Sequence, residues 1–438
     1  TILQLYKQTD GRTMYYGSNL LDMAPRYAFQ TVRKLEKYKA HMLSSAEKAE
    51  KEEQAYQAMS EKEKIHAKNQ RDHVLKEAKD ALLNVTMLVG GLIVAEDLTP
   101  VKTAYLALYN AAAKLRDEKN LRARYQLDKD SRAYQKKDTA KVDAKLAQCD
   151  ESIKAAQAEL DQRKQAVAQL HEQFKNHADY DKYQCNYDEG VDLARLVYNE
   201  IRMLRRDLQL IFQDPYSSLD PRKTVSQIIS EPIRANKILK TQKEIDERVA
   251  ELMETVGLAM RLFNTYPHEL DGGRRQRIGI ARALAMEPKF IVCDEPVSAL
   301  DVSIQAQILN LLKELQEKLG LSYIFITHDL AVVNHFADDI AVMYLGKIVE
   351  KAPAEELFTN PLHPYTKALL SAIPIPELGV QKERIPIKGE ITSPINMPDE
   401  CRFFKRCQYA CDKCKAVPPL VEVTPGHFVA CFRQDELN

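Results

Sequence analysis

The sequence has no net charge, no long hydrophobic run and no secretory signal at its start. Its 438 residues carry 63 basic and 63 acidic side chains, so no overall field favours a nucleic acid or an acidic surface. The longest apolar stretch, residues 81–95, is shorter than the roughly 18–20 residues that cross a bilayer and predicts a buried helix. We therefore expect a soluble chain without a nucleic-acid partner, which reaches a membrane only through another protein.

Glycine and proline are scarce in residues 28–200, which are dense in lysine, glutamate, alanine and glutamine. Ten positions there alternate by four and three residues, and nine of them are uncharged, which favours a coiled-coil or helical-hairpin arm. Residues 30–80 could supply its antiparallel partner. Two interpretations stay open, a solvated spacer and an arm that docks another protein. The ten positions are Val142, Leu146, Cys149, Ile153, Ala156, Leu160, Arg163, Val167, Leu170 and Phe174.

Mixed strand and helix patterns lie on both sides of this region. Residues 1–27 predict a helix end, a turn and a short strand at 13–17. After residue 200, short apolar runs alternate with helical patterns, which predicts an α/β domain with a largely parallel sheet and with its chemistry at the carboxyl ends of the strands. The strands are expected at 207–212, 290–293 and 322–326, and the clearest helix at 304–319.

Two carboxylates, Asp294 and Glu295, follow the apolar run at 290–293. The end of a buried strand places Asp294 where it can hold Mg²⁺ directly or through water. Glu295 then lies one residue further on, where it can polarise an attacking water. Because most such pairs simply end a strand at the surface, the interpretation depends on the neighbouring motifs.

A glycine pair at a predicted helix start precedes these carboxylates. Gly272 and Gly273 leave backbone N–H groups open to an anion, with the positive end of the helix dipole behind them. The first turn is basic, with Arg274 next in sequence, and positive charge there opposes the dipole. An approaching phosphate would explain this turn, and a capped helix is the alternative.

Five motifs in this order resemble those of the ABC transporter ATPase family. The resemblance implies the α/β P-loop NTPase fold of an ABC ATPase, with ATP and Mg²⁺ as cofactors. It also implies a head-to-tail dimer, in which each nucleotide lies between the phosphate loop of one subunit and the signature of the other. The matching residues are Gln213 (Q-loop), Asp271, Gly272, Gly273, Arg274 and Gln276 (signature), Asp294 and Glu295 (Walker B pair), Ser298 and Asp301 (D-loop) and His328 (switch histidine).

The family's roles carry over to these positions. Glu295, His328 and Gln213 would be catalytic, and Asp294 together with Gln213 would hold Mg²⁺. The signature and D-loop residues would contact the nucleotide. ATP-driven closure would then move a membrane permease.

Further segments narrow the resemblance to importers of oligopeptides and dipeptides. They are residues 212–222, 360–366, 389–396 and 401–407. The resemblance implies a peripheral subunit at the cytoplasmic face of the plasma membrane, which works with permease subunits and, indirectly, with a peptide-binding protein. A second ATPase subunit is also implied.

Five of the eight cysteines lie close together near the end of the chain. Four of them match the spacing of the importers' C-terminal extension, where some members bind a [4Fe–4S] cluster, and four thiolates suit such a cluster. Zn²⁺ accepts the same donors, and an unliganded group is the third alternative. The four are Cys401, Cys407, Cys414 and Cys431, whereas Cys411 is not expected to be a ligand.

The resemblance divides the chain into four segments. Residues 1–27 would be a remnant of the ATPase core, 28–200 an inserted helical coiled-coil arm, 201–350 the ATPase domain, and 351–438 a small extension with the cysteines. The phosphate loop Gly-x-x-x-x-Gly-Lys-Ser/Thr does not occur in the sequence. We therefore expect an N-terminally truncated ABC ATPase fold that cannot bind ATP tightly by itself.

Asp271 stands where the family usually has serine. A hydroxyl can donate to a γ-phosphate oxygen, whereas a carboxylate repels it, so we expect the composite site completed by this signature to hydrolyse ATP slowly. Because the two composite sites would then differ, a heterodimer with another ATPase subunit is expected.

Two alternative functions stay open. One is a chromosome-maintenance or DNA-repair ATPase with a coiled-coil arm, although in those proteins the arm follows the Q-loop and here it precedes Gln213. The other is a non-hydrolysing fragment that acts only as a scaffold.

Overall fold

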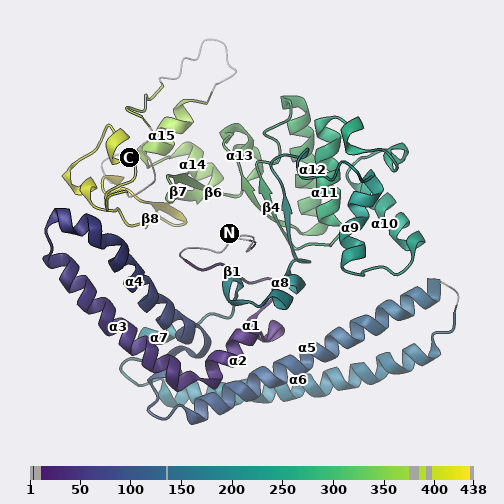
Figure 1. Ribbon diagram of the computed structural model, residues 1–438, viewed down its shortest axis with the longest axis horizontal. Coiled ribbons are helices and arrows are strands. Elements are labelled where there is room, and N and C mark those ends of the chain that lie inside the picture. Colours follow the sequence, from purple (N-terminus) through teal and green to yellow (C-terminus); the bar gives the residue numbers. More distant parts are fainter. Residues whose placement is uncertain (1–2, 4–10, 135–136, 374–383, 391–396, 435–438) are drawn as a thin grey trace. The chain divides into compact units, whose positions relative to one another are not determined.

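The computed structural model describes residues 3, 11–134, 137–373, 384–390 and 397–434 (Figure 1). It divides into two compact units, Thr1–Leu208 and Gln209–Asn438. The predicted helix end at residues 1–6 (apart from residue 3), the first two residues of the predicted turn at 9–12, and the importer-like residues 391–396 lie outside the described residues. Among the helices that are described, none is both long and apolar enough to cross a membrane.

The first unit is mainly helical. Its longest helices, α5 (Thr99–Tyr134) and α6 (Ala140–Phe174), lie side by side, and so do α3 (Leu35–Ala58) and α4 (Glu61–Val89) (Figure 1). Residues 28–200 are thus helical over most of their length, as the sequence predicts. The other elements are β1 (Met14–Tyr15), α1 (Leu20–Met23), α2 (Arg26–Arg33), η1 (Gly90–Val94), α7 (Tyr180–Gln184), β2 (Val191–Asp192), η2 (Leu193–Arg195) and α8 (Tyr198–Leu204).

Of the ten regularly spaced positions predicted at 142–174, which form the seam of α6, Arg163 is exposed, whereas six are buried in the pair of α5 and α6. The prediction that residues 30–80 supply its partner is wrong, because α5 folds back onto α6 across a short connection and α3 pairs with α4 in the same way. α5 carries its own apolar positions with four- and three-residue spacing, which the sequence analysis missed. They are Val101, Tyr105, Leu108, Ala112 and Leu115, and the buried positions of α6 are Val142, Leu146, Cys149, Ala156, Leu160 and Val167. The coiled-coil interpretation stays a prediction.

The strand predicted at 13–17 is present as β1, which pairs antiparallel with β2. Arg12 fixes this sheet to α4: its guanidinium contacts the Asp192 carboxylate at 3.0 Å and the Asn84 side-chain oxygen at 2.9 Å. Asp192 is buried, so the ion pair satisfies a charge that would otherwise be costly to bury. The segment boundaries at residues 27, 200 and 350 remain predictions.

The helix predicted at 81–95 is buried, but its last turn differs from the expectation. α4 ends at Val89 and continues as the 3₁₀ turn η1. Gly91 lies against the ring of Tyr180, where a Cβ would be only 2.4 Å from a ring carbon. The glycine pair therefore ends the α-helix and admits the tyrosine.

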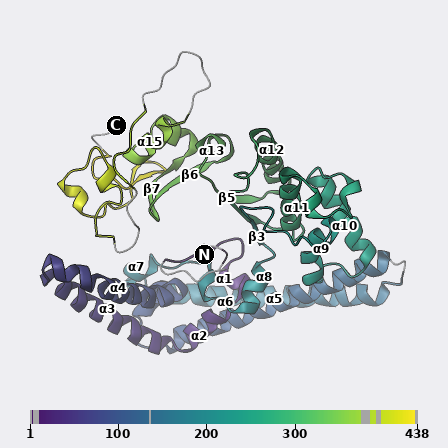
Figure 2. The ribbon, with the colours of Figure 1, turned by 45° about the horizontal axis from the view of Figure 1, so that its top comes forward.

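The second unit contains the predicted parallel strands. β3 (Leu208–Ile211), β4 (Phe290–Asp294) and β5 (Ser322–Ile326) form one sheet in this order, and β4 is parallel to β5. α11 (Gly272–Leu284) and α12 (Val302–Leu319) contribute Ile278, Ile280, Ile308 and Leu312 to the core that covers this sheet (Figure 2). The three strands and the predicted helix at 304–319 are confirmed.

A second, antiparallel sheet organises the end of the chain, in the order β6, β7, β9, β8. Its buried Glu350 accepts hydrogen bonds from the amides of Leu362 and His363 and contacts His427 Nε2 at 2.8 Å. The remaining elements of the unit are α9 (Val225–Ala235), α10 (Gln242–Thr255), η3 (Met260–Leu262), η4 (Pro267–Glu269), α13 (Leu330–Phe336), β6 (Asp339–Tyr344), β7 (Lys347–Pro353), α14 (Ala354–Thr359), α15 (Pro364–Ser371), η5 (Phe404–Arg406), η6 (Asp412–Lys415), β8 (Val421–Thr424) and β9 (His427–Val429).

Candidate functional site

Three predicted catalytic side chains meet where the parallel strands end. Glu295 follows β4, Gln213 lies two residues beyond β3, and His328 lies two residues beyond β5. Gln213 Nε2 donates to one carboxylate oxygen of Glu295 at 2.7 Å, and His328 Nδ1 lies 3.0 Å from the other. The two neighbours thus hold both oxygens of one carboxylate.

The backbone of Glu295 has an unusual conformation, with φ at +44°. Few residues other than glycine adopt this left-handed region, and such strain often marks functional sites. The Glu295 amide donates to the carbonyl of Ile326 at 2.9 Å, so the end of β5 helps to hold the strained residue. The hydrogen bond with His328, followed by contacts with Gln213 and Ser298, lowers the pKa of Glu295, which keeps its carboxylate ionised near neutral pH.

The other predicted residues of this edge lie close by. Asp294 is the exposed last residue of β4. The Ser298 hydroxyl donates to the Glu295 carbonyl at 3.1 Å. Asp301 caps α12 by accepting a hydrogen bond from the Ile304 amide at 3.1 Å.

Asp271 occupies the start of the signature helix α11. One of its carboxylate oxygens accepts a hydrogen bond from the Arg274 amide at 2.8 Å, and the other lies 3.2 Å from Arg274 Nε. The carboxylate therefore takes an amide that would otherwise face an incoming anion, and the guanidinium balances its charge. This local pairing accounts for Arg274 in the basic first turn.

The signature glycines have a packing role that the sequence analysis missed. A Cβ on Gly273 would lie 2.6 Å from Ile304 Cγ2, and one on Gly272 would lie 3.0 Å from Leu300 Cδ2. The starts of α11 and α12 therefore approach each other closely only because these positions lack side chains.

The sequence analysis also missed the structural contacts of the other arginines of α11. Arg275 Nε donates to the Pro267 carbonyl at 2.7 Å, and its guanidinium lies over the Tyr216 ring at 5.0 Å. Arg282 donates to the Ser218 carbonyl at 2.7 Å. These contacts tie α11 to the segment that follows Gln213, so no phosphate is needed to explain them.

An open groove of about 500 Å³ lies beside the signature. Asp271, Gly272, Gly273, Arg274 and Asp301 line it, whereas Gln276 is buried inside the unit. Arg261 and Arg277 add positive charge to the same groove. It has the size and the donors to receive an anionic ligand.

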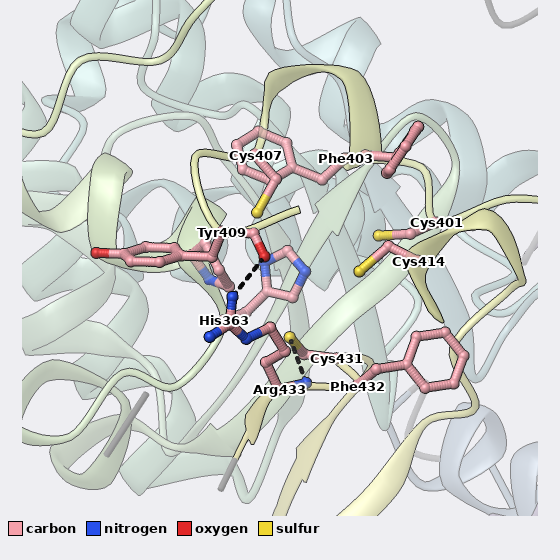
Figure 3. Close-up of a pocket in the computed structure, with 11 residues that line it drawn as sticks. His363, Cys401, Phe403, Cys407, Tyr409, Cys414, Cys431, Phe432 and Arg433 are labelled. Atoms are coloured by element: carbon pink, nitrogen blue, oxygen red, sulfur yellow. Dashed lines mark hydrogen bonds between the residues drawn. The ribbon is translucent and has the colours of Figure 1, made fainter. Parts of the chain in front are cut away.

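The four predicted cysteine ligands line a single small cavity (Figure 3). One of their sulfurs, that of Cys431, accepts a hydrogen bond from the Arg433 amide two residues further on, at 3.5 Å. Such bonds are typical of sulfurs that ligate a metal. The four are Cys401, Cys407, Cys414 and Cys431.

These thiols are groups that can ligate a metal ion, but they are not placed so that they form a metal site. Burial raises the pKa of Cys401 to about 11 and also raises those of Cys407, Cys414 and Cys431. The cavity among them is about 10 Å³, the size of one water. Within the described part of the chain, no three His, Cys, Asp or Glu side chains are placed so that they could hold a metal ion.

The contacts of Glu295 at the ends of these strands, together with the preceding signature helix α11 that packs against the start of α12, form the arrangement expected of an ABC-type ATPase. Comparison with known families agrees: the profile described as "ABC transporter" matches residues 165–298, and the one described as "Oligopeptide/dipeptide transporter, C-terminal region" matches residues 349–414.

Individual relatives narrow the family further. The chain is 51% identical over 250 residues to the oligopeptide transport ATP-binding protein OppF of Escherichia coli, which covers 57% of this chain and 75% of that protein. It is 51% identical over 246 residues to AppF of Bacillus subtilis, covering 55% and 74%. It is also 51% identical over 244 residues to a probable peptide ABC transporter ATP-binding protein, y4tS, of Sinorhizobium fredii, covering 56% and 69%.

The chain belongs to the ATP-binding subunits of oligopeptide and dipeptide ABC transporters. Its function is that of an ATP-hydrolysing subunit that powers peptide import. The alternatives of a DNA-repair ATPase and of a pure scaffold are not favoured.

Proposed function

We propose that Glu295 is the general base of ATP hydrolysis and that Gln213 and His328 position it. Its carboxylate is ionised, is held at both oxygens and lies at the edge of the sheet where ligands of α/β folds bind. This arrangement is the observation that carries the proposal.

In this proposal Glu295 accepts a proton from the attacking water. His328 and Gln213 keep the carboxylate oriented through contacts with both of its oxygens. Asp294 and Gln213 would hold Mg²⁺, which when bound neutralises charge on the phosphates. The Asp294 carboxylate, exposed at the end of β4, has the donor chemistry that this cation prefers.

The test is Glu295→Gln in the assembled transporter, with an ATPase subunit that carries this chain and a phosphate-binding loop. Loss of the base should lower turnover by about 100-fold or more. Glu317→Gln, on the exposed face of α12, is the matched control and should keep full turnover. A Glu295→Gln rate above a tenth of the unmodified rate would sink the proposal.

The groove at the signature would receive the nucleotide of a second ATPase subunit. There the carboxylate of Asp271 would repel the γ-phosphate, which supports slow hydrolysis. Its pairing with Arg274 offsets part of that repulsion, so that the site can still close. Since the partner's composite site need not share this feature, a heterodimer with a different ATPase subunit is the preferred assembly.

Tight ATP binding requires a phosphate loop in addition to the residues described. We expect the 438 residues alone to show no micromolar ATP binding by calorimetry. A measured dissociation constant in that range would contradict this expectation and show that the residues of the groove bind ATP tightly without a phosphate loop.

The four cavity-lining thiols are proposed as ligands of a [4Fe–4S] cluster, with Zn²⁺ as the alternative. The four cysteines around one cavity and the hydrogen bond from the Arg433 amide to the Cys431 sulfur support this. The sulfurs would have to move to ligate either, because their present placement holds no metal ion. Metal analysis after anaerobic purification would distinguish the two.

The remaining partners follow from the relatives. We propose that the chain docks on permease subunits at the cytoplasmic face of the plasma membrane and serves a peptide-binding protein through them. Residues 28–200 would be a helical arm inserted into the ATPase, as a spacer or as a docking arm. Its buried seam supports the spacer, since most of the regularly spaced apolar positions of α5 and α6 are covered by the other helix.

A further inference from the structure

Cys411 is the fifth cysteine of the C-terminal cluster, and it has no place among the proposed metal ligands. It does not line the cavity formed by the other four, yet its sulfur lies 3.6 Å from the sulfur of Cys414. All eight cysteines of the chain are free thiols. Cys414 therefore lines the four-thiol cavity and also contacts a fifth thiol outside it.

The backbone fixes this pair. Cys411 caps the 3₁₀ turn η6, and the Cys414 amide donates to the Cys411 carbonyl at 2.9 Å. The Cys414 carbonyl in turn accepts the Cys401 amide at 2.9 Å. The turn thus holds the two sulfurs close to each other, and Cys414 within it also lines the cavity.

The two thiols differ in access. Cys411 is partly exposed to solvent, whereas Cys414 is 7% exposed. A small reagent can reach Cys411 first, and the reaction can then pass to the buried neighbour. This order of access is what a two-step thiol–disulfide exchange requires.

We propose that Cys411 and Cys414 form a reversible disulfide with a low-molecular-weight disulfide as oxidant. The Cys411 sulfur attacks one sulfur of the oxidant, forms a mixed disulfide and releases one small thiol. The Cys414 sulfur then attacks Cys411, forms the protein disulfide and releases the second thiol. Two protein thiols are oxidised, one small disulfide is reduced to two thiols, and the two protein protons leave with them.

The disulfide would withdraw Cys414 from the four-thiol cavity. This consequence rests on the proposed metal site, whereas formation of the disulfide does not. A metal held by four thiolates would lose one ligand on oxidation, and a bound metal would in turn protect Cys414 from oxidation.

The experiment uses the full chain, stripped of metal and incubated without oxygen in defined mixtures of reduced and oxidised glutathione. Remaining thiols are alkylated and mapped by peptide mass spectrometry, and Lys413 allows the two cysteines to be separated by cleavage. We expect a disulfide between Cys411 and Cys414 that added reductant reverses. Cys185→Ser, at an exposed position in the first unit, should leave it unchanged.

Cys411→Ser is the decisive variant, because it removes the pair and keeps all four proposed ligands. Its Cys414 should remain alkylatable under conditions that oxidise the unmodified chain. The proposal is overturned if Cys414 pairs equally well with Cys401, Cys407 or Cys431, or if both Cys411 and Cys414 stay reduced when Cys185 is already modified by glutathione.

Zn²⁺ binding then separates this proposal from that of the metal site. Oxidation should weaken Zn²⁺ binding at least tenfold in the unmodified chain and leave it unchanged in Cys411→Ser. If the oxidised and the reduced chains bind Zn²⁺ equally well, the disulfide does not remove Cys414 from the metal ligands, and this part of the proposal is overturned. If the disulfide forms in a chain that binds neither Zn²⁺ nor an iron–sulfur cluster, the disulfide proposal is supported and the metal-site proposal is overturned.

Discussion

The two units bury their apolar residues in different ways. In the first unit, long helices such as α5 and α6 close on each other along seams of regular spacing. In the second, short strands are covered by helices, and the loops beyond the strands carry exposed polar side chains such as Gln213 and His328. In the first arrangement the apolar seams are covered by the paired helices. In the second, the loops at one edge of the sheet keep polar side chains exposed, where they can contact a ligand.

This difference explains why recognisable motifs lie in the second unit. The proposed catalytic site at the edge of the sheet needs particular side chains at particular strand ends, such as Glu295 after β4. A helical seam demands only apolar residues of suitable size at regular intervals. The first unit can therefore be stable without carrying a sequence that identifies its role.

The largest difference between the two units should come from a substitution that weakens the seam between α5 and α6. Leu160→Ala removes a side chain that is 5% exposed in the core of the first unit, and should cost about 2–5 kcal/mol of unfolding free energy. Hydrogen exchange in peptides of α5 and α6 should accelerate, with the second unit unchanged. Leu121→Ala, 37% exposed on α5, is the control. Equal losses in both variants would show that the seam is not what holds the helices.

The close approach of α11 and α12 should be the sensitive point of the second unit. Gly273→Ala places a methyl group 2.6 Å from Ile304 Cγ2 and should destabilise the unit by about 1–3 kcal/mol. Ile304→Ala in the same chain should recover part of this loss. Gly279→Ala on α11 meets nothing within 4 Å and should instead stabilise by about 0.5–1 kcal/mol. Denaturant melts that give both glycine variants the same sign would refute the packing role.

A smaller, functional effect is expected at the signature. Asp271→Ser removes the carboxylate that repels the γ-phosphate and should raise turnover of the assembled transporter about three- to tenfold. Arg274→Gln, with Asp271 retained, should lower it, because the carboxylate loses its counter-charge 3.2 Å away. Steady-state ATPase assays at saturating ATP check both. Unchanged turnover in Asp271→Ser would count against the slow-site proposal.

The smallest effect concerns pH in the first unit. His171 lies between the hydroxyl groups of Tyr105 and Tyr180, at 3.1 and 2.7 Å, and burial lowers its pKa below the ordinary 6.5. The unfolded chain therefore takes up a proton first, so stability is present above pH 6.5 and is lost as the pH falls through the lowered value. The loss should be at most about 1 kcal/mol per unit of lowered pKa.

Thermal melts of His171→Gln between pH 7.5 and 5 measure this loss. The variant should start less stable and show a flatter slope than the unmodified chain. His66→Gln, at an exposed position on α4, should keep the original slope. Parallel slopes for the unmodified chain and His171→Gln would exclude the histidine as the source.

The strand ends that carry Gln213, Glu295 and His328 could be predicted, because each strand is a short, mainly apolar run with one of these polar residues one or two positions beyond it. Asp294 and Glu295 after 290–293 are an example. The contacts of Arg275, Arg282 and Tyr216 could not be predicted, since they join segments far apart in the chain through carbonyl groups that any residue supplies. The partner of α6 was missed although the spacing of Val101, Tyr105 and Leu108 was visible in the sequence.

The sequence by itself determined the three strands at 207–212, 290–293 and 322–326, the helix at 304–319, the family to which the motifs belong, and the four cysteines that line one cavity. It did so because periodicity and motif order are local properties of the chain. Only the tertiary structure decided that Asp271 pairs with Arg274, that Gly273 admits Ile304, and that Cys411 faces Cys414 from outside the cavity. These contacts depend on how side chains pack in three dimensions, and spacing along the chain does not fix that.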